Sequence, residues 1–156
     1  MERNLISAHQ WTIVQLVGRV MARKQIDPEQ VDVHSPDAAK AALRTFFRIA
    51  DAWRLTIDQQ KALLGLRAGS TFYKWRSGEV GTLSRDVLER LSYVFGIYKA
   101  LQILLPDPKA ADEWVQKPNM APLFGGRSAL DRMAAGRVAD LYEVRKYLDA
   151  QRGGWA

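Results

Sequence analysis

Apolar residues recur at intervals of three and four along most of the chain, the spacing that places side chains on one side of an α-helix. Alternating runs of valine, isoleucine and threonine, which would indicate strands, are weak throughout. The first periodic stretch, residues 7–24, spreads its apolar positions around more than one side of a helix. Such a wide stripe either packs against a partner chain or folds back on its own core. The whole pattern predicts an all-α protein.

Two long amphipathic helices are predicted in the middle of the chain. Residues 25–37 contain two prolines and four acids with little periodicity, so they are interpreted as a linker. An amphipathic helix follows over residues 39–53. The strongest period of all covers residues 83–105, and the prolines that follow end it.

Two short helices are predicted between these long ones. Thr56 or Asp58 caps the first, and Gly65 stops it. The second occupies residues 70–77. A short helix, a glycine turn, a second short helix and then a long scaffold helix is the order found in a helix-turn-helix DNA-binding module.

The second short helix mixes aromatic, hydroxyl and basic side chains that separate by angle around the helix axis. Phe72 and Trp75 are three residues apart and share one face, which anchors the helix to the core. The polar residues fall on the opposite face and the flanks, where they meet phosphates and base edges. In the alternative interpretation, Tyr73 joins Trp75 in the core and the cations only aid solubility. The candidate DNA-binding residues are Arg67, Ser70, Thr71, Tyr73, Lys74, Arg76 and Ser77.

The charge distribution favours the same segment. The chain has a net charge of +6, and the stretch between Asp58 and Glu79 contains four cations and no anion. This is typical of a surface that meets phosphate, although a solvated face has the same pattern. One short helix makes few base contacts, each discriminating by about 1–3 kcal/mol, so a homodimer on a two-fold operator is expected.

The last third of the chain is organised differently. A short helix over residues 110–116 leads into the loop "KPNMAPLFGGRS", residues 117–128. Ser128 stands three residues before Asp131, which predicts a capping box at the start of another helix. Gly136 breaks that helix, and a final helix turns its apolar residues inward.

Residue usage excludes several chemistries. The chain has no cysteine, so disulfides, thiolate metal sites and thiol catalysis are ruled out. His9 and His34 lie far apart and lack neighbours at ligand spacing, which argues against zinc or a histidine triad. We expect a protein that is not an enzyme and needs no metal or cofactor. No apolar run reaches the ~18 residues that span a bilayer, and the acidic second residue does not suit a signal peptide, so a cytoplasmic location without membrane contact is expected.

Two segments resemble a known family. The stretch "LLGLRAGSTFYKWRSGE" resembles the Xre-like helix-turn-helix of the Xre/MbcA/ParS antitoxins, and "EWVQKPNMAPLFGGRSALDRMAAGRVADLYEVRKYLDA" is similar to that family's C-terminal toxin-binding domain. The resemblance covers about residues 40–152. It implies a partner of a RES-domain toxin, which consumes NAD or uses it for ADP-ribosylation. It further implies that the antitoxin covers the toxin's substrate cleft and that its helix-turn-helix represses the shared operon by binding operator DNA, as a homodimer within a toxin–antitoxin hetero-oligomer.

Arginines and aromatic residues of the tail are the candidate contacts to the toxin. Both residue types are enriched where interfaces bind most strongly, and arginines suit a cleft built for a dinucleotide phosphate. Alternatively, the arginines pair with Asp131, Asp140, Glu143 and Asp149 on the surface of their own helices. The candidate toxin-binding residues are Asn119, Phe124, Arg127, Arg132, Arg137, Tyr142, Arg145, Arg152 and Trp155.

The sequence thus divides into three parts. Residues 1–35 form an N-terminal helix and linker, residues 36–105 the helix-turn-helix domain, and residues 106–156 the toxin-binding domain. An alternative function, based on the basic middle third alone, is a free-standing transcriptional repressor without a toxin partner.

Overall fold

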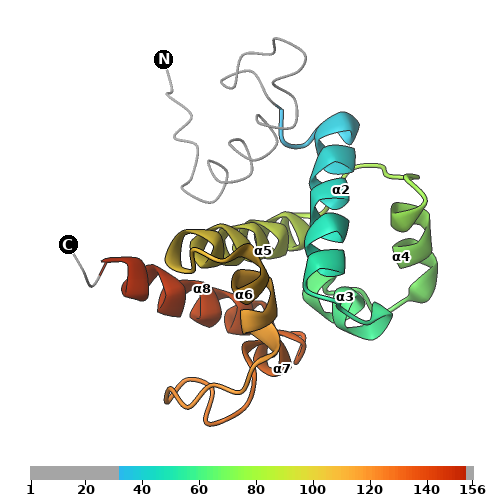
Figure 1. Ribbon diagram of the computed structural model, residues 1–156. Coiled ribbons are helices and arrows are strands. Elements are labelled where there is room, and N and C mark those ends of the chain that lie inside the picture. The colour runs from blue at the N-terminus through green and yellow to red at the C-terminus, as the bar shows by residue number, and fades with distance from the viewer. Residues whose placement is uncertain (1–31, 154–156) are drawn as a thin grey trace, which may run out of the picture.

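A computed structural model describes residues 32–153, and within this range the regular secondary structure is entirely helical (Figure 1). The described part has one isolated β-bridge, between Pro118 and Ser128, and no extended strand. The expected all-α class is confirmed, whereas the helix expected at residues 7–24 lies outside the described residues. The helices are α2 (Pro36–Ala52), α3 (Ile57–Leu64), α4 (Gly69–Arg76), α5 (Arg85–Leu104), α6 (Pro108–Glu113), α7 (Ala129–Met133) and α8 (Val138–Gly153), with a 3₁₀ turn η2 (Trp114–Gln116) after α6.

Helix α5 is the centre of the molecule. Residues 91–97 are buried without interruption, which means that α5 is covered on all sides rather than along one stripe. Figure 1 shows α2, α3 and α4 grouped at the beginning of α5, and α8 running beside it. Leu91 and Phe95 of α5 belong to one continuous apolar cluster with Phe46 of α2 and Leu141 of α8. Both halves of the described chain therefore share a single core.

Side-chain caps fix where several helices begin. Thr56 and Gln59 form a reciprocal capping box at α3, which settles the choice between Thr56 and Asp58 as the cap. Ser128 and Asp131 form a second capping box at α7, as the sequence predicts. Helix α3 ends at Gly65, whose φ of +71° lies in the left-handed region that favours glycine.

A buried arginine on α5 connects the helix-turn-helix segment with the C-terminal helices. Arg90 of α5 is only 8% exposed, and its Nε donates to the Asp86 carboxylate at 2.8 Å. One of its terminal nitrogens donates to the carbonyl oxygen of Gly136 at 3.0 Å and lies 3.4 Å from that of Ala62. Arg90 therefore connects the end of α3 with the turn between α7 and α8.

Candidate nucleic-acid and protein interfaces

Helix α4 is attached to the body of the protein through its aromatic face. Phe72 is fully buried, and its ring meets the ring of Phe47 from α2 edge to face, with 5.8 Å between centroids. Trp75 is half-buried and packs against the same core. The opposite face of α4 is consequently held in one orientation.

That opposite face is polar and open to solvent. Tyr73 is 58% exposed, and its neighbours Ser70 and Lys74 are exposed as well. The exposure of Tyr73 argues against the alternative in which Tyr73 and Trp75 are both core residues. Ser77 is exposed and donates its hydroxyl to the carbonyl oxygen of Lys74, which closes the last turn of the helix.

The remaining candidates for DNA contact lie at the edges of this face. Arg67 is exposed in the turn between α3 and α4, and Thr71 is half-buried. Arg76 is turned toward the body of the protein, because its guanidinium donates to the buried side chain of Gln60 at 3.0 Å. It also lies 3.6 Å from the Asp51 carboxylate and 5.3 Å from the centroid of the Phe47 ring. These contacts assign Arg76 to holding α4 in place.

The loop 117–128 is closed by its own backbone hydrogen bonds and exposes one bulky apolar side chain, that of Met120. The Asn119 amide donates to the carbonyl of Arg127, and the Gly126 amide donates back to the carbonyl of Asn119. The Asn119 side chain accepts from the amide of Ala121, so it shapes the loop. Met120 is 84% exposed, the largest exposure among the bulky apolar residues that the structure describes. Sequence reasoning missed Met120, although a methionine between an asparagine and a nearby proline in a glycine-containing loop has no helical neighbours to cover it.

The expectation that Phe124 contacts a toxin is corrected by its burial. Phe124 is only 5% exposed. Its ring meets Tyr147 of α8 at 5.1 Å and Trp114 at 5.9 Å between centroids, both edge to face. This aromatic cluster anchors the loop to α8, which leaves Phe124 no surface to present to a partner.

Four of the five tail arginines are paired within the described chain. Asp140 is almost fully buried, accepts two hydrogen bonds from Arg137 at 2.9 and 3.1 Å, and lies 3.5 Å from Arg132. Bonding to this carboxylate raises the pKa of Arg137 above the ordinary arginine value. Arg132 also donates to the carbonyl of Leu123. The alternative interpretation thus named the right partner in Asp140, but this carboxylate is buried rather than on the helix surface.

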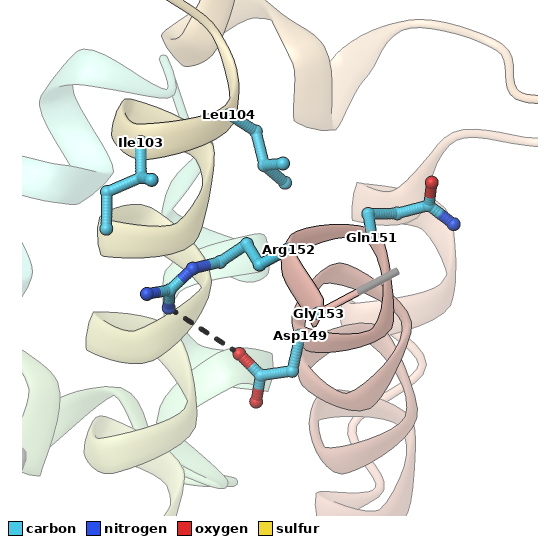
Figure 2. Close-up of a pocket in the computed structure, with 6 residues that line it drawn as sticks. All are labelled: Ile103, Leu104, Asp149, Gln151, Arg152 and Gly153. Carbon is cyan, nitrogen blue, oxygen red and sulfur yellow. Dashed lines mark ion pairs between the residues drawn. The ribbon is translucent and has the colours of Figure 1, made fainter. Parts of the chain in front are cut away.

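Asp149 likewise pairs with two of the tail arginines, near the end of α8. Its carboxylate accepts a hydrogen bond from Arg145 at 2.7 Å. It also lies 3.8 Å from Arg152, an ion pair drawn in Figure 2. Arg152 lines a shallow pocket between the ends of α5 and α8, together with Ile103 and Leu104. Arg127 is exposed and makes no ion pair with any residue in the range 32–153, so it is the tail arginine with its charge most available to a partner.

The two remaining aromatic candidates differ in what the structure describes. Tyr142 is partly exposed on α8, beside Tyr93 of α5, with 5.9 Å between ring centroids. Burial, reinforced by a hydrogen bond to Glu89, raises the pKa of Tyr93. The ammonium group of Lys146 lies over the Tyr142 ring, 5.9 Å from its centroid. Trp155 lies outside the described residues.

Comparison with known proteins identifies both halves of this arrangement. Residues 32–96 match the model of the antitoxin Xre-like helix-turn-helix domain, and residues 100–154 match that of the antitoxin Xre/MbcA/ParS C-terminal toxin-binding domain. The chain therefore belongs to the Xre-type antitoxins, and neither description names a catalytic activity.

The chain is similar to the protein named "Uncharacterized protein y4oB" from Sinorhizobium fredii (strain NBRC 101917 / NGR234). It is 51% identical over 130 residues, which cover 82% of this chain and 98% of that protein. No solved structure matches the chain. Within residues 32–153, no group of three or more potential metal ligands is found, and no helix is both long and apolar enough to cross a membrane.

Proposed function

We propose that the protein neutralises a RES-domain toxin that consumes NAD or ADP-ribosylates a target, by covering the toxin's active-site cleft. We further propose that it represses its own operon by binding operator DNA as a homodimer. The pairing of an antitoxin helix-turn-helix with a toxin-binding domain in one chain supports both parts. The RES class of the toxin follows from the resemblance described for the sequence.

One observation carries the proposal: the described chain exposes two chemically different surfaces on one core. The first is the polar face of α4, with Tyr73 and Lys74. The second is the exposed surface of the loop 117–128, with Met120 and Arg127. The two surfaces lie on different sides of α2 and α5 (Figure 1).

At the first surface, the interaction proposed is with duplex DNA. Lys74 and Arg67 attract phosphates and release condensed counterions, a contribution that does not depend on base sequence. Ser70 and Tyr73 carry hydroxyl groups that donate and accept hydrogen bonds at base edges or phosphates. The buried Phe72 fixes the angle at which these groups meet the groove.

At the second surface, the partner is the toxin. Arg127 supplies a planar cation suited to a cleft that binds the phosphates of a dinucleotide. Met120 supplies an apolar side chain that fills an irregular pocket. Because the loop is tied by its own backbone bonds and anchored by Phe124, little conformational entropy is lost when it docks.

The proposal is tested by searching the reading frames beside the chain's own gene for a small RES-domain protein and co-expressing that protein with the chain. The expected result is a stable complex that co-purifies and in which NAD turnover by the toxin is abolished. A chain that binds duplex DNA yet captures no such neighbour, and leaves its NAD turnover unchanged, supports the alternative of a free-standing repressor.

A further inference from the structure

A basic groove separates α2 from the end of α4, outside the face of α4 described above. It has a volume of about 350 Å³. Four cations line it, Lys40, Arg44, Arg48 and Arg76, together with one carboxylate, Asp51. Four positive charges and one negative charge leave the groove with a net charge of +3.

The excess charge comes from three residues of α2. Lys40, Arg44 and Arg48 are spaced four apart and therefore lie one above the other along the helix. Like charges at this spacing repel and weaken a helix. All three are exposed, and none forms an ion pair with another residue between 32 and 153, whereas Arg76 is paired with Asp51. The helix therefore keeps an uncompensated positive stripe along the groove.

The groove also has an apolar part. Phe47 of α2 and Trp75 of α4 both line it. The groove is far larger than the roughly 10–15 Å³ that a single water needs on the same measure, so it can admit a group larger than water. Cations around aromatic rings fit a chain of alternating phosphates and sugars.

We infer that this groove binds the sugar–phosphate backbone of duplex DNA beside the base pairs that α4 meets. The groove adjoins the proposed DNA-binding face, because Ser77, an exposed candidate for DNA contact one helical turn after Tyr73, also lines it. Figure 1 shows α2 and α4 side by side, with the loop 117–128 in another part of the molecule. The inference rests on the proposed operator binding and adds phosphate contacts from α2 to it.

The test compares variants with equal charge loss. In the first, Lys40→Gln, Arg44→Gln and Arg48→Gln are combined, because glutamine is a good helix former and removes the mutual repulsion. In the matched control, Lys99→Gln, Lys109→Gln and Lys146→Gln remove three charges from α5, α6 and α8. Binding to a labelled mixed-sequence duplex several helical turns long is followed by fluorescence anisotropy over a series of salt concentrations.

The groove variant is expected to bind less tightly and to show a smaller salt dependence. The slope of log K against log salt falls by about 0.9 for each phosphate that the protein no longer neutralises, so a decrease of roughly two to three per protomer is expected. The control is expected to keep the slope of the unmodified chain. The single change Arg44→Gln, expected to lower the slope by ~0.9, provides a milder second variant. Melting followed by circular dichroism is expected to show an unchanged or higher Tm for the groove variants.

Three other outcomes would contradict the inference, each in a different way. If the unmodified chain does not bind duplex DNA at low salt, the proposed operator binding fails and the inference fails with it. If the unmodified chain binds and Lys74→Ala weakens binding, but the groove variant keeps its affinity and slope, only the inference fails. If the groove variant keeps duplex binding but no longer captures the co-expressed toxin, the groove binds an acidic protein surface instead.

Discussion

The buried guanidinium of Arg90 donates to the carbonyl oxygen of Gly136 at 3.0 Å, which ties the helix that follows the DNA-binding motif to the turn before α8. Replacing it in Arg90→Met leaves this carbonyl, and that of Ala62, without the donor. We expect the free energy of unfolding to fall by about 1–3 kcal/mol, measured by urea denaturation. Arg85→Met, at an exposed position of the same helix, is the control and is expected to change it by less than about 0.5 kcal/mol. Equal effects of the two changes would show that the hydrogen bonds of Arg90 contribute nothing.

Replacing Arg76 and replacing Lys74 on α4 are expected to have different effects: the first lowers stability and the second weakens DNA binding. Arg76→Ala takes the donor from buried Gln60 and the cation from Phe47, so we expect a loss of about 1 kcal/mol in the free energy of unfolding. Lys74→Ala is expected to leave stability unchanged while lowering the slope of log K against log salt for duplex binding by about 0.9. Urea denaturation measures the stability of both variants, and fluorescence anisotropy measures their binding to duplex DNA. If Lys74→Ala reduced stability and Arg76→Ala did not, Lys74 rather than Arg76 would be the residue that holds α4 in place.

Two residues of the loop 117–128 separate its anchoring from its proposed contact with the toxin. Phe124→Ala empties a buried aromatic site between Trp114 and Tyr147, so we expect it to reduce the free energy of unfolding by about 3 kcal/mol. Met120→Ala is expected to change it by less than about 0.5 kcal/mol and to weaken toxin binding about tenfold, equivalent to ~1.4 kcal/mol. Thermal melting and calorimetric titration with the toxin distinguish the two. Unaltered affinity for the toxin in Met120→Ala would exclude Met120 from the interface.

The tail arginines are expected to differ in their contribution to toxin binding. Arg127→Ala removes an exposed cation without an ion pair in the described range, and we expect affinity for the toxin to fall about tenfold with stability unchanged. Arg152→Ala removes a cation already paired with Asp149, and we expect little change in affinity. The affinity of each variant is measured by titrating the toxin with it and following NAD turnover in the mixture. A larger loss of affinity in Arg152→Ala than in Arg127→Ala would show that the toxin contacts the end of α8 rather than the loop.

Local patterns in the sequence predicted the helices well, because their boundaries depend on residues close in the chain. Thr56, Gly65 and Ser128 act within three or four residues of their own positions, so their roles could be inferred without tertiary structure. The same holds for the faces of α4, since the angle between Phe72 and Tyr73 follows from helix geometry alone.

Contacts between distant segments could not be predicted in this way. Phe124 stands in a loop whose composition suggests exposure, but it packs in the core against rings that include Trp114 and Tyr147. The pair formed by Arg132 and Asp140 joins residues on either side of a turn, whereas the pair formed by Arg145 and Asp149 follows from helical spacing. The α2 cations did carry a local signal, the repeated spacing of four, but their groove needs α4 as its second wall.

Sharing α5 has a genetic consequence. A premature stop codon that removed α8 would uncover the side of α5 that packs against it, where Tyr93 meets Tyr142, and the shortened product would aggregate rather than persist as a smaller regulator. A cell carrying such an allele would lose the proposed control of transcription together with the proposed immunity to the toxin, so the two traits would be inherited and lost as one.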